Sequence, residues 1–299
     1  MMSNRFAVSL NCYTWGDYDV AQCLERIAQT PIRRVELPVE QIRRGSLVPE
    51  LMLPISLQGN WRYSLPDLQA LLDSHGITVD SLDAFGYLGH TGSEGIIKRR
   101  VDFAVALGAD MIVLGMHHMA LAADSRASTE EQETARQAIY QILREVADYA
   151  AEGGVRLALE IHGGITANAT EARRTLEEVG RENLGINFDT ANILYYDDDL
   201  DSAGGAEALR ILADRVFHVH LKDIVRGASR EENVLPRLGL GIVDFPRVFS
   251  ILEEAAVDGV YSFEVETFHG ATEATSIEPY QADLLASVEY IRSIGQFPA

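Results

Sequence analysis

Basic residues, cysteines and long apolar runs are all scarce in this sequence of 299 residues. It carries 25 Lys and Arg residues against 45 Asp and Glu residues, which gives a formal net charge of −20. A surface that binds nucleic acid needs basic side chains to neutralise phosphates, so this charge argues against a nucleic-acid partner. It argues equally against docking on an anionic membrane surface.

The cysteines and the apolar segments exclude further classes of protein. Cys12 and Cys23 form neither a disulfide framework nor a metal-site spacing, so we expect free thiols in a reducing cytosol. No run approaches the ~18 apolar residues of a membrane-spanning helix. The first ten residues show no cleavage pattern of a secretory signal. The sequence therefore predicts a cytoplasmic protein without a membrane segment, and it is compatible with a homo-oligomer.

Eight strand-like segments alternate with eight helix-like segments along the chain. The strands are expected at Phe6 to Trp15, Arg33 to Val39, Ile77 to Phe85, Met111 to His117, Val155 to Gly163, Leu184 to Asn192, Val216 to Ile224 and Val260 to Thr267. The helices are expected at Val20 to Gln29, Ser64 to His75, Glu94 to Leu107, Thr129 to Ala151, Thr170 to Val179, Ala206 to Ala213, Asp244 to Ala256 and Pro279 to Ile294. This order predicts parallel crossover units that close into a single (β/α)8 TIM barrel over residues 1–299.

Two features refine this expectation. An open, doubly wound sheet is the alternative, but its strands would read as near-continuous apolar runs, whereas these strands alternate. The segment at about 40–63 is long and rich in turn residues. We expect it to form an irregular excursion beyond the second strand.

The segment His218-Val219-His220-Leu221-Lys222 shows a strand with one apolar face and one polar face. Its period of two places Val219 and Leu221 on one side, and both histidines with the lysine on the other. In a barrel the apolar side packs on the helices and the polar side faces inward. Inward residues late in a strand lie at the C-terminal mouth, where barrel enzymes keep their active sites.

The fifth to eighth predicted strands together offer three carboxylates and an imidazole to one mouth. The four residues are Glu160, Asp189, His220 and Glu264. Carboxylates that share a site repel one another, and a divalent cation removes that penalty. We therefore predict that these four residues bind one metal ion, with Mn²⁺ as the expected ion and Mg²⁺, Co²⁺ or Zn²⁺ as alternatives. The spacing does not choose between Glu264 and Glu266, because both face inward.

Several motifs resemble the xylose isomerase-like sugar isomerase/epimerase superfamily over nearly the whole chain. They are Leu159 to His162, Asn187 to Asn192, His218 to Asp223, Gly239 to Phe245 and Ser262 to Glu266. The resemblance implies one divalent metal held by the four predicted ligands, two of which, Glu160 and Glu264, also move the proton. It favours Glu264 over Glu266 as the ligand. This chain has Asn192 where some epimerases of the superfamily have a histidine.

Further polar or aromatic residues near the predicted strand ends are candidate substrate contacts. They are Trp15, Glu36, His117, His162, Asn192, His218, Lys222, Arg226 and Glu266. Several also have a structural interpretation: a core position for Trp15, a hydrogen bond behind the ligands for His162 and His218, and a solvated loop for Arg226. Lys222 either holds a substrate oxygen or pairs with Asp223. Gly239 and Gly241 are expected to permit a tight loop.

The predicted function is a metal-dependent isomerase or epimerase of an open-chain ketose or keto-polyol. A metal ion would acidify the C–H bond beside the carbonyl and stabilise an enediolate, while Glu160 and Glu264 act as acid and base. The alternatives are an inosose dehydratase-like enzyme, an apurinic endonuclease-like enzyme, which the negative charge disfavours, and a barrel that binds a sugar without turnover. No glycine-rich loop with a lysine opens a helix, which favours a substrate without phosphate.

Overall fold

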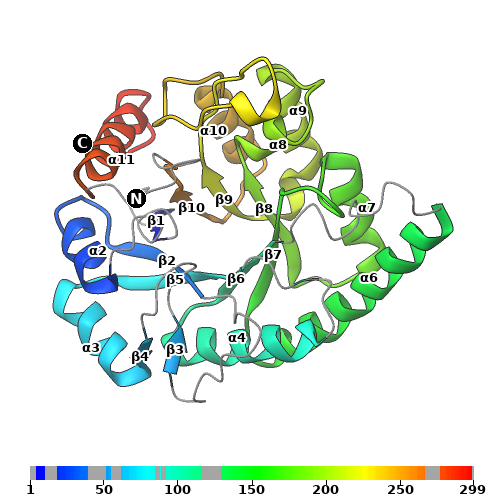
Figure 1. Ribbon diagram of the computed structural model, residues 1–299, viewed down its shortest axis with the longest axis horizontal. Coiled ribbons are helices and arrows are strands. Elements are labelled where there is room, and N and C mark those ends of the chain that lie inside the picture. The colour runs from blue at the N-terminus through cyan, green and yellow to red at the C-terminus, as the bar shows by residue number, and fades with distance from the viewer. Residues whose placement is uncertain are drawn as a thin grey trace.

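The computed structural model describes residues 5–10, 19–39, 52–54, 62–84, 88, 92–115, 129–266 and 277–297. In this part of the chain, parallel strands close into an eight-stranded barrel in the order β1-β10-β9-β8-β7-β6-β5-β2 (Figure 1). The strands are β1 (Phe6–Ser9), β2 (Arg34–Pro38), β5 (Thr78–Asp83), β6 (Met111–Leu114), β7 (Arg156–Glu160), β8 (Leu184–Asp189), β9 (Val216–Leu221) and β10 (Val260–Phe263). Each lies inside the segment predicted for it, so the (β/α)8 barrel is confirmed.

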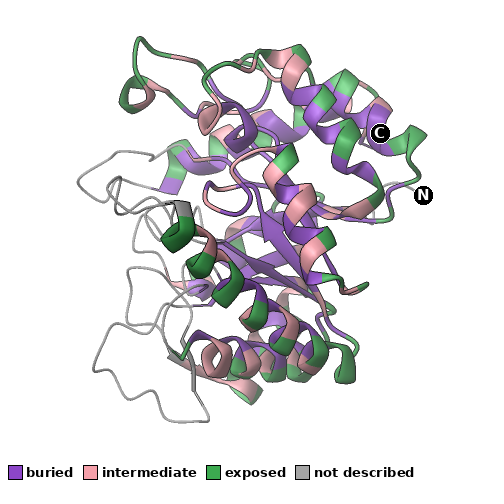
Figure 2. Cartoon of the chain, turned by 90° about the vertical axis from the view of Figure 1, so that its right-hand side faces the viewer, coloured by how far each residue is buried: buried purple, intermediate pink, exposed green. Residues whose placement is uncertain are grey.

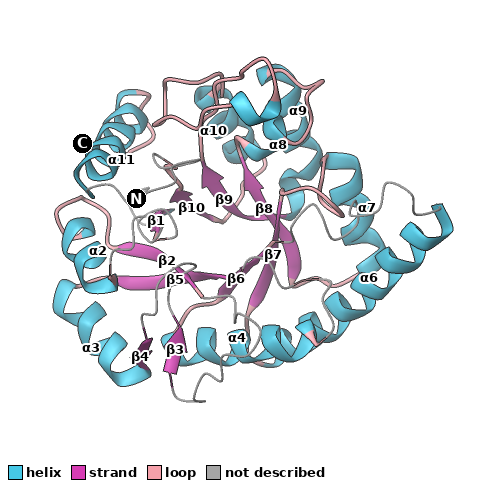
Figure 3. Cartoon of the chain, in the orientation of Figure 1, coloured by secondary structure: helices cyan, strands magenta, loops and turns pink. Residues whose placement is uncertain are grey.

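Helices surround the barrel and connect its strands (Figure 3). They are α2 (Val20–Ile27), α3 (Leu65–His75), α4 (Ser93–Leu107), α6 (Thr129–Glu152), α7 (Ala169–Val179), α9 (Ser202–Leu212), α10 (Phe245–Glu254) and α11 (Ile277–Ser293), with 3-10 turns at Ala213–Arg215 and Arg230–Glu232. The ends of α3 follow the predicted signals: the Ser64 side chain caps its first turn, and Gly76 ends it in the left-handed conformation. No helix in the described ranges has the length and apolar character needed to cross a bilayer.

The two faces of the strands are chemically different, as the alternation predicted. Val219 and Leu221 are fully buried against the helix layer, and most residues of the barrel strands are buried (Figure 2). The inward positions carry polar side chains that are equally buried, among them Asn187, His218 and Ser262. Strand register places Asn187 beside His218, and Ser262 beside His220, so these polar groups form layers across the interior.

Two local features differ from the sequence-based expectation. Within the predicted irregular excursion, β3 (Met52–Pro54) and β4 (Arg62–Ser64) form an antiparallel pair; residues 40–51 and 55–61 lie outside the described ranges. Strand β8 ends at Asp189 rather than at Asn192, because Asp189 Oδ1 accepts the backbone N–H groups of Ala191 and Asn192 at 2.9 and 2.8 Å. That turn starts the short helix α8 (Asn192–Tyr195), which the sequence analysis did not predict.

Candidate metal centre

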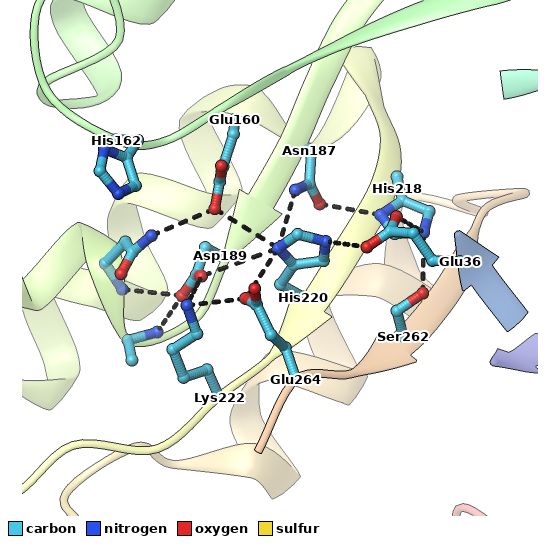
Figure 4. Close-up of polar contacts among 12 residues, drawn as sticks. Glu36, Glu160, His162, Asn187, Asp189, His218, His220, Lys222, Ser262 and Glu264 are labelled. Atoms are coloured by element: carbon cyan, nitrogen blue, oxygen red, sulfur yellow. Dashed lines mark hydrogen bonds and ion pairs between the residues drawn. The ribbon is translucent and has the colours of Figure 1, made fainter. Parts of the chain in front are cut away.

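The four predicted ligands converge at the C-terminal mouth of the barrel. Glu160 ends β7, Asp189 ends β8, His220 lies near the end of β9, and Glu264 follows β10 directly. One oxygen or nitrogen atom from each lies within 4.8 Å of the atoms from the other three, and all four residues are buried. Figure 4 shows their side chains pointing toward one another. The strand alternation therefore placed these residues in one cluster.

The carboxylates in this cluster have the character of cation ligands. Burial raises the pKa of Asp189 to about 7, against the lowering effect of Lys222. Burial also acts to raise the pKa of Glu264, but His220 and Lys222 outweigh it and hold that pKa well below its usual range. Asp189 Oδ2 and Glu264 Oε2 are buried, and their charged partners are Lys222 and, for Glu264, also His220. Oxygen donors of this kind, with one imidazole, fit a divalent cation.

His220 presents its Nδ1 atom to the carboxylates. This atom lies 2.9 Å from Glu264 Oε2, 3.4 Å from Glu160 Oε1 and 3.8 Å from Asp189 Oδ2. Burial favours the neutral ring, but Glu264 and Glu36 outweigh it and raise the pKa of His220 well above its usual value. A proton and a metal ion therefore compete for this nitrogen, since a ligating imidazole must give up the proton on its ligating atom.

Lys222 places a buried ammonium group beside the cluster. Its Nζ atom lies 2.9 Å from Asp189 Oδ2, 2.7 Å from Glu264 Oε2 and 2.8 Å from Glu266 Oε1. Burial acts to lower the pKa of Lys222, but the three carboxylates outweigh it and raise that pKa well above its usual value. The ammonium group is therefore charged. The alternative expectation, that Lys222 pairs with Asp223, is wrong, because the Asp223 carboxylate accepts backbone N–H groups of another loop.

The geometry separates the two glutamates that follow β10. Glu264 belongs to the four-residue cluster and contacts His220 directly. Glu266 contacts Lys222 instead, and its side chain is 16% exposed against 5% for Glu264. In this arrangement Glu264 is the candidate ligand, and Glu266 lies one contact further toward the solvent.

Glu36 and His218 lie in the closed interior of the barrel, below the mouth where a substrate would bind. Both side chains are fully inaccessible to solvent, and Glu36 lies on the side of His220 away from the three carboxylates (Figure 4). Burial acts to raise the pKa of Glu36, but His220 and His218 outweigh it and lower that pKa to about 2. Burial lowers the pKa of His218 to about 4. Near neutral pH the interior therefore holds a glutamate anion and a neutral histidine.

Three side chains line the mouth beside Glu160. Asn192 donates a hydrogen bond from Nδ2 to Glu160 Oε1 at 3.3 Å. The ring of His162 packs against the ring of Tyr196, with the ring centres 4.8 Å apart and the planes tilted by 50°. The Tyr196 hydroxyl lies 3.1 and 3.0 Å from the two ring nitrogens of His162. Sequence reasoning missed Tyr196, although its place just after the unpredicted helix α8 puts it at the mouth. Asn192 orients a candidate ligand, and the contact of His162 with substrate stays a prediction.

Arg226 is engaged by backbone rather than free in solvent. Its guanidinium donates to the carbonyl oxygens of one residue of α8 and three of the loop that follows it, at 2.5–3.1 Å: Leu194, Asp197, Asp198 and Leu200. These contacts fasten the loop that follows β8 to the loop that follows β9. Arg226 thus has a structural role at the rim, and its substrate contact stays a prediction.

Asp223 fastens the glycine-containing loop that the sequence analysis singled out. Its carboxylate accepts the backbone N–H groups of Gly239 and Gly241 at 2.9 and 2.8 Å, and those of Ile224 and Val243 at 2.9 and 3.2 Å. A Cβ atom on Gly241 would lie only 2.2 Å from Asp223 Oδ1. The expected tight loop is confirmed, and close approach of the carboxylate explains why it needs glycine here.

Gly241→Ala is therefore expected to destabilise the protein by roughly 1–3 kcal/mol, the usual cost of overpacking a filled site. Gly95→Ala is the control, because a Cβ there would meet only the end of the Arg99 side chain, at 4.0 Å. Because Gly95 lies within helix α4, alanine there should stabilise the protein by about 0.5–1 kcal/mol. Urea unfolding of both variants measures the difference, and equal midpoints would contradict the close approach.

Some expectations fall outside the described residues, and one buried acid was not anticipated. Trp15, His117 and Cys12 lie outside the described ranges, while Cys23 is a buried free thiol. Asp83 ends β5, and burial, aided by Glu36, raises its pKa well above the usual range. The signal for it was present, since Ser81 and Asp83 share the inward face of the third predicted strand.

Comparison with known proteins settles the family. The model of the xylose isomerase-like TIM barrel family matches residues 25–294. The chain belongs to this family. It is 27% identical over 192 residues to an inosose dehydratase of Histophilus somni, covering 58% of this chain and 63% of that protein. It is 28% identical over 173 residues to an L-ribulose 3-epimerase of Methylomonas sp., covering 56% and 54%. The chain thus spans between half and two thirds of the length of these relatives.

The fold is shared more widely than the sequence. A crystal structure of the IolI protein with a bound zinc atom superposes with a TM-score of 0.70, covering 99% of both chains at 19% identity. At this identity the likeness shows the common barrel. The xylose isomerase-like relationship expected from the motifs is confirmed by the family model and by this fold.

Proposed function

We propose that this chain is a divalent-metal-dependent isomerase or epimerase of a ketose or keto-polyol. The observation that carries the proposal is the convergence of Glu160, Asp189, His220 and Glu264 on one buried point at the mouth. Three carboxylates and one imidazole suit Mn²⁺, with Mg²⁺, Co²⁺ and Zn²⁺ as alternatives. Relatives named as epimerases and dehydratases support sugar or polyol chemistry.

The protein residues supply the proton transfers in this proposal. A bound divalent ion would act as a Lewis acid toward a carbonyl and its neighbouring hydroxyl. Glu264, ionised by its contacts with His220 and Lys222, is suited to remove a proton from the carbon beside the carbonyl. Glu160 approaches from β7, which β8 and β9 separate from β10 in the barrel, and is held by Asn192. It would return the proton from another direction, which inverts the carbon or moves the carbonyl.

Solvent deuterium tests this proposal directly. Turnover in D₂O should place deuterium on the carbon beside the carbonyl, because the abstracted proton exchanges on a carboxylate. Proton NMR of the product measures it, with a panel of unphosphorylated ketoses and inososes as substrates. Complete retention of the substrate hydrogen with full turnover would remove the acid–base role of the two glutamates.

Dehydration of a keto-polyol is the second candidate, and Lys222 favours it. The same base would remove the proton, and a β-hydroxyl group would then leave as water. The charged Lys222 ammonium beside Glu264 and Glu266 is the kind of donor that a departing hydroxyl requires. Mass spectrometry separates the two reactions, because dehydration loses one water molecule and isomerisation conserves mass.

We also propose an unphosphorylated substrate, a cytoplasmic location and a role in carbohydrate metabolism. The three carboxylates around Lys222 would repel a phosphate group, and Arg226 is engaged by backbone carbonyls. The net charge of −20 supports the absence of a nucleic-acid partner. Assembly into a homo-oligomer is compatible with these proposals.

A further inference from the structure

A directed chain of hydrogen bonds runs through the barrel interior beneath the metal centre. It links Ser262 Oγ to His218 Nε2 at 3.0 Å, His218 Nδ1 to Asn187 Oδ1 at 2.9 Å, Asn187 Nδ2 to His220 Nδ1 at 3.1 Å, and His220 Nε2 to Glu36 Oε1 at 2.8 Å (Figure 4). Its five members come from strands β2, β8, β9 and β10, and all are buried. We call this the interior chain.

The proton positions along the interior chain follow from its end. A glutamate anion only accepts, and Ser81 already donates to the second oxygen of Glu36 at 2.8 Å. His220 Nε2 must therefore carry a proton and donate it to Glu36. The amide oxygen of Asn187 accepts from His218 Nδ1, and its amide nitrogen lies 3.1 Å from His220 Nδ1. Ser262 donates to His218 Nε2, the ring nitrogen that carries no proton.

The consequence for the metal centre lies at His220 Nδ1. Nδ1 faces Glu264 and Glu160 at 2.9 and 3.4 Å, so in the metal-free protein a proton on Nδ1 bridges to these carboxylates. A bound metal ion would replace that proton, while Nε2 keeps the proton that it donates to Glu36. The contact with Glu36 thus leaves Nδ1 as the ring nitrogen that a metal ion can bind.

We infer that Glu36 is a positioning residue that holds the proton of His220 on Nε2 and so keeps Nδ1 as the metal-ligating atom. This inference rests on the proposed metal centre. Of the four predicted ligands Glu36 contacts only His220, and its other partners are Ser81 and His218. A carboxylate behind a ligating histidine also makes the ring a stronger donor, and losing such a partner weakens metal binding by about 10–100-fold.

Nuclear magnetic resonance of the wild-type protein loaded with ¹¹³Cd²⁺ tests the tautomer without any substitution. With ¹⁵N-labelled histidine, the cadmium coupling is expected on Nδ1 of one residue, whose Nε2 carries a slowly exchanging proton. Loss of these signals in His220→Gln assigns them. Coupling to Nε2 would overturn this inference alone. Failure to bind cadmium or Mn²⁺ would overturn it together with the proposed metal centre.

Substitution of Glu36 tests its role in affinity. Glu36→Met keeps the volume but removes the acceptor, and it should weaken Mn²⁺ binding by on the order of 10–100-fold. Glu36→Gln keeps an acceptor oxygen and should lose less. Ser81→Ala is the matched control, because it perturbs the other oxygen of Glu36 and leaves the bond to His220 intact. Circular dichroism establishes folding, and calorimetric titration measures the affinity.

The order of the Mn²⁺ affinities of these variants decides whether the inference holds. A folded Glu36→Met protein with wild-type Mn²⁺ affinity would show that the contact with Glu36 is only structural and would overturn the inference. An equal loss in Ser81→Ala would do the same, since it would point to general damage of the interior. If Glu36→Met does not fold, the cadmium coupling in the wild-type protein still decides the ligating atom.

Discussion

His220→Ala is expected to lose the bound divalent ion entirely. His220 is the sole nitrogen donor in the four-residue cluster, and its removal takes away one of the four donors and the ring that contacts Glu264 and Glu160. For the wild-type protein, Mn²⁺ at about 100 times its Kd should add about 2.7 kcal/mol of stability. That gain should raise the melting temperature by a few degrees, and the rise should be absent in His220→Ala. Elemental analysis and thermal-shift titration measure both effects.

His75→Ala is the control for loss of one histidine. His75 lies in the last turn of α3, away from the barrel mouth, and its removal should leave metal content unchanged. Because His220 also bonds to Glu36 and Asn187, the folded state of His220→Ala must be established by circular dichroism. A folded His220→Ala protein that still holds one equivalent of Mn²⁺ would disprove the assigned centre.

Glu160→Gln and Glu264→Gln are expected to lower kcat by on the order of 10²–10⁴-fold each, the usual contribution of positioned acid–base catalysis. Glutamine conserves the volume and an oxygen donor, so much of the fold should be retained. What it removes is the ability to accept a proton. Steady-state kinetics on the substrate identified from the sugar panel measures the loss.

Metal loss could imitate this result, so Mn²⁺ occupancy has to be measured in each variant. Glu266→Gln is the matched comparison, because it contacts Lys222 but lies outside the four-residue cluster. It should keep the metal and lose less activity than either other variant. Near wild-type turnover by metal-loaded Glu160→Gln or Glu264→Gln would remove that residue from the proton transfer.

The same cluster also decides between the two candidate reactions. An epimerase or isomerase needs two groups that exchange a proton with carbon, and Glu160 and Glu264 meet that need. A dehydratase needs one base and a donor for the leaving hydroxyl, which Glu264 and Lys222 would supply. Lys222→Met should therefore affect dehydration far more than proton exchange at the carbon beside the carbonyl.

The sequence by itself determined the barrel and the four-residue cluster. Both follow from local regularities: a strand has a period of two, and a strand followed by a helix returns parallel to its start. Once His218, His220 and Lys222 are placed on one strand face, the barrel geometry brings their neighbours Glu160, Asp189 and Glu264 to the same mouth. This step uses only the strand period and the parallel order of the strands.

Only the tertiary structure decided which polar groups touch one another within that interior. Glu36 lies 184 positions from His220 in the chain, and strand register and closure of the barrel are what bring it behind the ring instead of into the mouth. The same holds for Lys222, which meets three carboxylates rather than its neighbour Asp223. Arg226, expected at the substrate, bonds to carbonyls of the preceding loop. Periodicity fixes the face on which a side chain lies, but its partner depends on barrel closure and loop paths, which arise from contacts between distant segments.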